Sequence, residues 1–348
     1  SKPSPESLWG IYLVDVFDNR LLLHEEAGHA MLEPIPLRRT PRPPVIPDRV
    51  DTSRKDAVVF LADVYAGDAM KGVAHGTVKA LRLVGYEFAF HGMGGQIDRV
   101  GFDGPWDVKR ILGTVPIDED GSAMFRVPAY TPIAVQPLDG EGKAVQLMRS
   151  WFTAMPGEIL SCTGCHEPQN SAPSPRRSIA AARQPAEITP WYGPARGFSF
   201  DREVQPVLDR LCIACHDAKA SPERRAPPDL TQREPVHLQA GSPDYNSGAR
   251  FPPSYIELRR VVRSPTIESD LHVLPPREFH ADTTRLVQML RKGHHGVVLD
   301  REAWDRIVTW IDLHAPAHGT WTEVCGEERV KRLNGRRRAL RKLYTGVD

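Results

Sequence analysis

Short apolar runs separated by turn residues dominate residues 9–155, a pattern typical of β-strands. A run over 9–16, a turn over 17–20 and a return run over 21–24 predict a β-hairpin. Later runs of the same type lie at 57–64, 77–90, 111–117, 123–127, 133–137 and 144–152. Gly-containing turns separate several of them, so residues 56–155 are expected to form a β-sandwich.

Helical periodicity replaces this pattern in the last third of the chain. Apolar residues from Val204 to Leu211 share one helical face, which predicts an amphipathic helix from about Asp201. Helices are also expected over 282–292 and 300–313, each with Asp as N-cap, and over about 327–343. The predicted fold class is therefore α+β and multidomain, with a β-sandwich-like domain followed by a mostly α-helical domain.

Two proline-rich stretches divide the chain. Residues 34–48 hold six prolines in fifteen positions and predict an extended linker, and residues 168–197 are rich in Pro, Ser, Ala and Arg. We therefore expect four segments. They are a β-hairpin over 1–33, the linker over 34–48, a β-rich middle domain over 49–197 and a helical domain over 198–348.

The pattern Cys-x-x-Cys-His occurs twice and indicates two covalently bound c-type haems. Two thiols at this spacing can reach the two vinyl groups of one haem, and the adjacent histidine can bind the iron. A four-cysteine zinc site is the alternative, but 46 residues separate the pairs and a histidine follows each of them. The attachment residues are Cys162, Cys165, His166, Cys212, Cys215 and His216.

The second iron ligands are less well defined by the sequence. Adjacent side chains diverge, so one of His294 and His295, after Gly293 at a helix end, is expected on the second iron. No obvious second ligand follows the first motif, so its iron is expected to be more open. Other candidates are His272, His280, His314, His318 and Met289, although Met289 has the spacing of a core residue.

Three further motifs carry less weight. The histidines of His24-Glu25-Glu26-Ala27-Gly28-His29 are five apart and do not share a helix face, which excludes a zincin site. The glycine-rich stretch 91–95 lacks the third glycine of a dinucleotide fingerprint. Cys325 has no cysteine partner outside the motifs, and we interpret it as a small buried hydrophobe rather than a thiolate ligand.

Composition and charge restrict the possible partners. The length of 348 residues suggests two or three domains. A net charge of +1 does not favour nucleic acid, and no apolar run is long enough to span a membrane. Residues 329–342 contain eight Lys or Arg and no acid, which indicates either a solvated helix face or a docking patch for an acidic redox partner protein.

The cellular location follows from the haem chemistry rather than from a signal segment. The N-terminus has no basic and apolar leader pattern, and we interpret the sequence as a mature or excised chain. Because haem is covalently attached outside the cytoplasm, a periplasmic or otherwise extracytoplasmic location is expected.

Several stretches resemble the hydrazine synthase alpha-subunit family. They are 103–109 (DGPWDVK), 151–158 (WFTAMPGE), 161–167 (SCTGCHE), 293–296 (GHHG) and 310–321 (WIDLHAPAHGTW), and the likeness covers most of residues 50–322.

The resemblance implies a haem-bearing middle domain and a C-terminal cytochrome domain, with a β-propeller ahead of them. On this view the hairpin over 1–33 is a remnant of that preceding domain. The family has an iron-binding tyrosine four residues after the first motif histidine, where this chain has Asn170. The resemblance therefore implies architecture and haem content rather than hydrazine synthesis.

Two functions remain from the sequence. The first is a dihaem electron-transfer protein with both irons six-coordinate. The second is a haem-dependent redox enzyme that acts on a small nitrogen or oxygen species at a more open first haem. The coordination of the first iron distinguishes them.

Overall fold

The computed structural model forms two compact units, residues 1–48 and residues 49–348. It describes residues 9–345 except for 43, 46–47, 90–91, 96–97, 103, 105, 167–176, 218, 220–226, 238–248 and 266–272.

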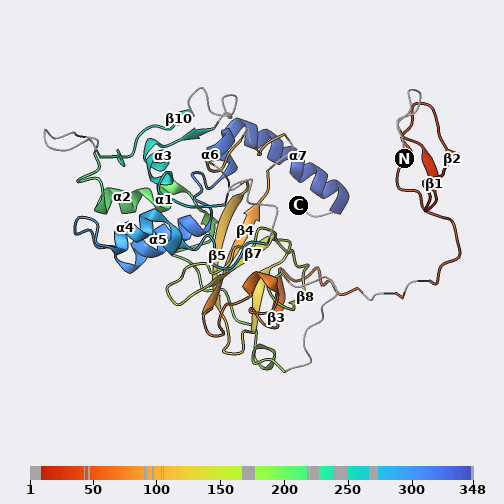
Figure 1. Ribbon diagram of the computed structural model, residues 1–348, viewed down its shortest axis with the longest axis horizontal. Coiled ribbons are helices and arrows are strands. Elements are labelled where there is room, and N and C mark those ends of the chain that lie inside the picture. Colours follow the sequence, from red (N-terminus) through yellow and green to blue (C-terminus); the bar gives the residue numbers. More distant parts are fainter. Residues whose placement is uncertain are drawn as a thin grey trace. The chain divides into compact units, whose positions relative to one another are not determined.

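The smaller unit contains the predicted hairpin (Figure 1). Strands β1 (Ile11–Val14) and β2 (Arg20–His24) pair antiparallel, with Val14 opposite Arg20. Asp15 closes the turn because its carboxylate accepts the backbone N–H of Phe17 at 2.8 Å. The hairpin is confirmed, while its origin as a propeller remnant stays a prediction.

Two sheets form the β-rich part of the larger unit (Figure 1). The three-stranded sheet has the order β6-β3-β8, and the four-stranded sheet has the order β7-β4-β5-β9. All their pairings are antiparallel except β3 with β8, which is parallel. The strands are β3 (Asp56–Leu61), β4 (Ala80–Glu87), β5 (Val108–Pro116), β6 (Ala123–Pro128), β7 (Ile133–Leu138), β8 (Ile159–Cys162) and β9 (Arg196–Gly197).

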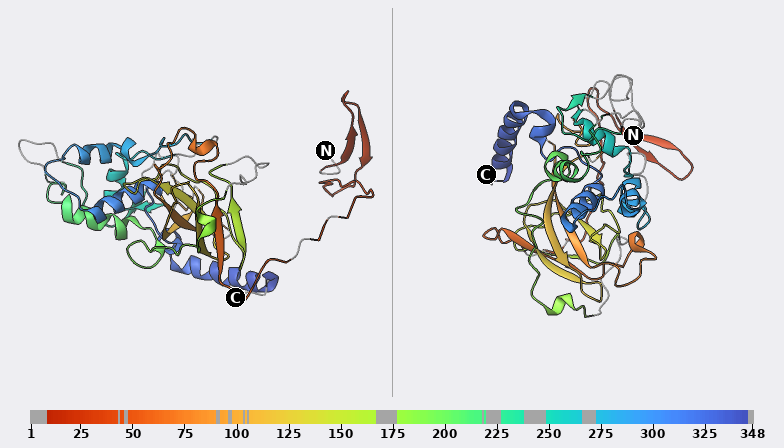
Figure 2. Two further views of the ribbon diagram at one scale, coloured as in Figure 1. Left: turned by 90° about the horizontal axis from the view of Figure 1, so that it is seen from below. Right: turned by 90° about the vertical axis from the view of Figure 1, so that its left-hand side faces the viewer.

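The four-stranded sheet is covered on both faces. Leu81 and Leu83 of β4 pack in a core shared with Val59 and Phe125 of the other sheet. Val84 belongs instead to the core formed by the helices. Alternate side chains of a strand point to opposite faces, so β4 contributes to two cores at once. The expected sandwich of two sheets is therefore present, with helices as a third layer (Figure 2).

The strand expected over 144–152 was wrong. This stretch forms only isolated bridges, from Ala144 to Leu138 and from Phe152 to Ile133. Between the two bridges, a side-chain contact takes the place of backbone pairing: the Met148 sulfur accepts the N–H of Val135 at 3.4 Å. The alternating apolar residues of this stretch therefore belong to a loop and not to a strand.

The helices follow the strands along the chain. They are α1 (Phe200–Glu203), α2 (Gln205–Leu211), α3 (Pro253–Arg259), α4 (Arg285–Arg291), α5 (Arg301–Asp312), α6 (Trp321–Cys325) and α7 (Glu327–Thr345). A short β10 (Val236–His237) and β11 (Arg250–Phe251) pair between α2 and α3. Among the described residues, 3₁₀ turns lie at Asp68–Met70, Ala180–Ala182 and Ala281–Thr283.

The two predicted caps differ in outcome. Asp300 caps α5, because its carboxylate accepts the N–H of Ala303 at 2.8 Å. Asp282 does not cap α4, whose N-cap is Thr284 without a side-chain hydrogen bond. The Asp282 carboxylate instead pairs with the ammonium of Lys143 at 2.8 Å.

In the described part of the chain, the helices are all too short or too polar to cross a membrane. Residues 49–348 form one compact unit, and their division into two domains at residue 197 stays a prediction.

Candidate functional site

Strand β8 places the first motif. It pairs in parallel with β3, with Cys162 opposite Leu61. The motif then continues along the segment after β3: the N–H of Ala62 donates to the Cys162 carbonyl at 2.9 Å, and the N–H of Cys165 donates to the Ala66 carbonyl at 2.8 Å. Both motif cysteines contact the core between the two sheets. The first Cys-x-x-Cys segment is thus fixed to a sheet edge.

Two glycines allow this close approach. A Cβ on Gly164, inside the motif, would lie 2.2 Å from the carbonyl oxygen of Ala66. A Cβ on Gly67, which has φ of 101°, would lie 2.1 Å from the carbonyl oxygen of Cys165. Neither distance is possible for a real side chain, so both positions require glycine.

The first motif lines a cavity of about 840 Å³. This volume is within the range of about 300–1,000 Å³ typical of small-molecule and cofactor sites. Its walls are mainly apolar side chains from both sheets and from the 144–152 loop. Cys162, Gly164, Cys165 and His166 line it together with Val59, Leu61, Leu81, Phe125, Leu147 and Phe152.

Several polar side chains also reach this cavity, among them Tyr86, Asp107 and Lys109. Burial lowers the pKa of the Lys109 ammonium to about 8, against the opposing effect of Asp107. Burial also raises the pKa of the Tyr86 phenol to about 12. The Lys109 ammonium lies 5.7 Å from the Tyr86 ring centroid.

His314 lines the same cavity, although 147 residues separate it from His166 in the chain. It follows α5, whose last residue is Asp312. Burial and the nearby charges of Lys109, Arg149 and Arg259 hold the pKa of the His314 imidazole well below its usual range. The imidazole is therefore neutral at pH 7.

The second motif follows α2 directly, as the amphipathic pattern predicted. The N–H of His216 donates to the Cys212 carbonyl at 3.0 Å, which continues the helical turn. The Nδ1 atom of His216 lies 3.1 Å from the Pro228 carbonyl oxygen. A proton on Nδ1 donates this hydrogen bond and leaves Nε2 with its lone pair available to a metal.

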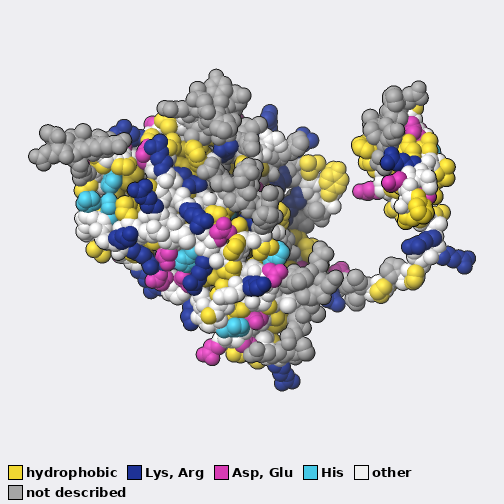
Figure 3. All heavy atoms as spheres, in the orientation of Figure 1, with side chains coloured by type: hydrophobic (Ala, Val, Ile, Leu, Met, Phe, Trp, Pro, Cys, Tyr) yellow, Lys and Arg dark blue, Asp and Glu magenta, His cyan; other side chains and the backbone are white. Residues whose placement is uncertain are grey.

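The structure brings His294 to the second motif. The imidazole rings of His216 and His294 have centroids 6.0 Å apart. His294 is half-buried, whereas its neighbour His295 is exposed and has a positive φ of 48°. Burial, His295 and His216 together lower the pKa of His294. In Figure 3, histidine side chains gather over α2 and α4.

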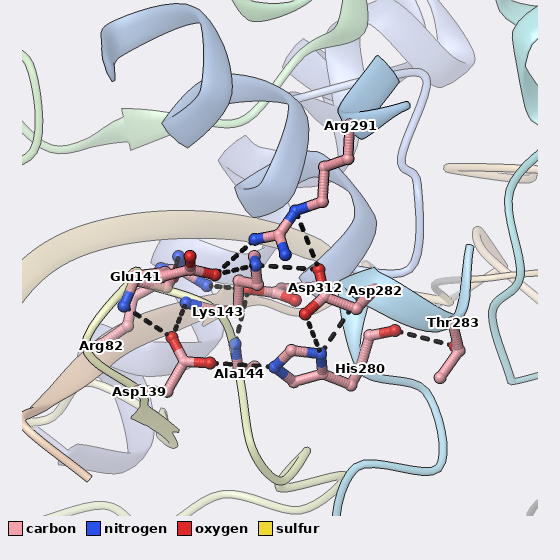
Figure 4. Close-up of polar contacts among 11 residues, drawn as sticks. Arg82, Asp139, Glu141, Lys143, Ala144, His280, Asp282, Thr283, Arg291 and Asp312 are labelled. Carbon is pink, nitrogen blue, oxygen red and sulfur yellow. Dashed lines mark hydrogen bonds and ion pairs between the residues drawn. The ribbon is translucent and has the colours of Figure 1, made fainter. Parts of the chain in front are cut away.

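His280 lies elsewhere, in a polar network between the sheet and the helices (Figure 4). Its Nε2 is 3.0 Å from a carboxylate oxygen of Asp139, and its Nδ1 accepts the N–H of Asp282 at 3.3 Å. Although burial alone would raise it, hydrogen bonds from His280 and from backbone N–H groups lower the pKa of Asp139 to about 2. Both ring nitrogens are engaged with protein atoms, and we do not propose His280 as an iron ligand.

The remaining candidates have other roles or lie outside the described residues. Met289 packs against the helical core, and Cys325 packs beside Val100, Val108 and Trp321. Burial, together with Asp98, raises the pKa of the Cys325 thiol to about 12. His272 and Asn170 are not among the described residues.

The cysteine pairs do not converge on one zinc site. The first pair contacts the core between the sheets, and Cys212 contacts the core of the helices. Across the described ranges, no group of three or more His, Cys, Asp or Glu is arranged to hold a metal ion by itself. Each motif therefore has its own surroundings.

Comparison with known proteins finds a family match in part of the chain. Residues 76–167 match the family described as the hydrazine synthase alpha subunit middle domain. The chain is related to the hydrazine synthase alpha subunit. The matched segment ends just after His166, so it includes the first motif and most of the strands that hold it.

The relatives are distant and longer. The hydrazine synthase subunit alpha of Kuenenia stuttgartiensis is 21% identical over 342 residues, covering 76% of this chain and 41% of that protein. The solved structure of Kuenenia stuttgartiensis hydrazine synthase shares the fold with a TM-score of 0.56 and 18% identity, over 77% of this chain and 44% of that chain. This chain thus spans about two fifths of the length of its relative.

Proposed function

We propose that this chain is a dihaem c-type cytochrome of the hydrazine synthase alpha-like type that transfers electrons between redox partners. The geometry of the second motif carries this proposal. With metal–nitrogen bonds of about 2 Å and imidazole centroids about 1 Å beyond each nitrogen, two histidines on one iron have centroids about 6 Å apart. His216 and His294 have this separation, at 6.0 Å.

The residues present fit haem c at both motifs. At the first motif, Cys162, Cys165 and His166 line a cavity with room for a cofactor. At the second, the Nδ1 hydrogen bond of His216 to the Pro228 carbonyl sets the tautomer that a metal ligand needs. A bound haem supplies one-electron iron chemistry, and the chain supplies its attachment, axial ligands and burial.

The test of haem content is the intact mass of the denatured full chain, produced with c-type haem maturation. We expect the polypeptide mass plus two haems. Replacing Cys212 and Cys215 with Ala should leave one haem, and replacing Cys162 and Cys165 should leave the other. A wild-type mass equal to the bare polypeptide would refute the proposal.

The axial pair of the second haem has a matched test within the chain. We expect His294→Ala to convert the second haem to a high-spin, ligand-accessible form, because the half-buried imidazole that faces His216 is lost. The adjacent His295→Ala removes an exposed imidazole and should leave the spectrum of the oxidised protein unchanged. The reverse result would assign His295 instead.

An enzyme is the second candidate function, and the first cavity favours it. Tyr86, Asp107 and Lys109 could bind or orient a small nitrogen or oxygen species beside an open iron. Binding of nitric oxide or cyanide to the wild-type protein distinguishes the two functions. Rapid binding at one iron would favour the enzyme, and no binding at either would favour the electron carrier.

We also propose an acidic redox partner protein and a location outside the cytoplasm. The basic residues of α7 are exposed from Arg336 to Lys342, so a charged partner can reach them. Electron transfer from such a partner should slow as ionic strength rises. Replacing Arg336, Arg337 and Arg338 with Gln should reduce this salt dependence, and an unchanged dependence would show that docking occurs elsewhere.

A further inference from the structure

A haem attached at the first motif would have a second axial position opposite His166, and few side chains in the cavity could fill it. Among the described lining residues outside the motif, a nitrogen or sulfur atom that can bind haem iron is present in Lys109, Met148 and His314. The Met148 sulfur already accepts the backbone N–H of Val135 at 3.4 Å. The Lys109 ammonium donates a hydrogen bond to the Leu313 carbonyl oxygen at 3.4 Å. His314 remains as the imidazole of the cavity wall.

The backbone around His314 is unusual. His314 and Ala315 are consecutive non-glycine residues with positive φ, 69° and 52°. Such residues carry backbone strain and persist only where surrounding contacts enforce them. Their presence in succession shows that strong contacts fix this turn, and that the direction of the His314 side chain is enforced.

Four side chains from other elements provide those contacts. The Arg82 guanidinium donates to the Asp312 carboxylate at 2.9 Å, and the Gln136 amide donates to the Asp312 carbonyl at 2.8 Å. Lys109 contacts the Leu313 carbonyl, as described above, and the Tyr255 hydroxyl donates to the Ala315 carbonyl at 2.8 Å. Figure 4 shows Arg82 and Asp312 at this junction of sheet and helix.

The ring of His314 differs from those of His280 and His318, whose ring nitrogens contact protein atoms. It makes no hydrogen bond to any residue that the structure describes, and part of its surface is accessible within the cavity. By contrast, the His318 ring contacts the Arg250 carbonyl at 2.8 Å and stacks on Phe251. An imidazole on a cavity wall without a protein partner is available to a bound ligand or a metal.

We propose that His314 is the second axial ligand of the first haem, on the face opposite His166. This inference rests on the proposed haem attachment at Cys162 and Cys165. Ligation by two histidines closes the iron to added molecules and keeps it low-spin. The first haem then serves electron transfer, and the more open iron expected from the sequence is replaced by a closed one.

The test compares two histidines of the same segment in the full dihaem protein. We expect the oxidised wild-type protein to be fully low-spin by electron paramagnetic resonance and absorption. His314→Ala should convert half of the iron to a high-spin form that binds cyanide, and added imidazole should restore the low-spin spectrum. The matched control His318→Ala removes an imidazole that does not line the cavity, and it should leave both haems low-spin.

The outcomes separate the inference from the function on which it rests. If the variant with Cys212 and Cys215 replaced by Ala carries no haem, the haem proposal for the first motif is itself refuted. Two haems with a His314→Ala spectrum identical to the wild type refute only the role of His314. If His314→Ala does not fold, His314→Met is the second variant: it should raise the potential of one haem by replacing imidazole with thioether, and an unchanged potential would overturn the inference.

Discussion

Loss of the Arg82 guanidinium should strongly destabilise the larger unit. Arg82 and Asp312 form an ion pair at 2.9 Å with side chains 1% and 0% exposed. The same guanidinium also donates to Gln136 at 2.9 Å and to the Thr309 hydroxyl at 3.0 Å. Among the described residues, Arg82→Met leaves the buried Asp312 carboxylate with the Ala144 N–H as its one remaining donor, at 3.0 Å.

The magnitude follows from the burial of this pair. Removing one partner of a buried ion pair costs about 3–5 kcal/mol, because the other charge loses its partner. With an unfolding entropy of about 2.1 cal/mol/K per residue over roughly 300 residues, this lowers Tm by about 5–8 °C. The double variant Arg82→Met with Asp312→Asn should recover part of the loss, because neither charge is then buried alone.

An exposed pair of similar length provides the control. Arg54 and Asp56 also pair at 3.0 Å, but their side chains are 40% and 35% exposed. Arg54→Met should therefore lower Tm by less than about 2 °C. Thermal unfolding followed by far-ultraviolet circular dichroism measures both variants. An Arg82→Met shift no larger than that of Arg54→Met would refute the reasoning.

Three further variants test other local arguments. Gly164→Ala should lower the free energy of unfolding by about 1–3 kcal/mol and reduce haem attachment at the first motif, measured by intact mass, because its Cβ would lie 2.2 Å from the Ala66 carbonyl oxygen. The control Gly140→Ala has nothing within 4 Å of its Cβ and should change neither quantity. Asp300→Ala should lower the free energy of unfolding in urea by about 1 kcal/mol through loss of the α5 cap, and Asp300→Asn should retain most of it. The lowered pKa of Asp139, about 2, contributes stability that is present above pH 4 and is lost as the pH falls toward 2. The advantage of wild type over Asp139→Asn in urea titrations should therefore shrink across that window.

The sequence predicted the parts of this fold that local patterns encode. Alternation of apolar residues found β3 to β7, and the Asp300 cap marked the start of α5 correctly. Strand β8 was missed because it has four residues and pairs with β3, about 100 residues earlier in the chain. No local sequence pattern predicts a short parallel strand of this kind.

The position of His314 was also beyond local reasoning, for a different reason. Its direction depends on Arg82, Gln136 and Lys109, which lie on three separate strands. Composition does not predict two consecutive non-glycine residues with positive φ, because each non-glycine side chain disfavours that backbone conformation. The excess of histidines in the last third was visible, but their distribution between the two motifs required the tertiary structure.

Helix α5 connects the two proposed haem sites. Ile307 and Ile311 pack in the same core as Leu208 of α2, the helix that leads into the second motif. The last residue of α5, Asp312, is held by Arg82 from the sheet and precedes His314 in the first cavity. Both sites are therefore attached to one rigid element whose position is fixed by a buried ion pair. Under the proposed function, a shift of α5 would disturb His314 and the packing behind the second motif together, so Arg82→Met should change the spectrum of the first haem as well as the stability of the unit.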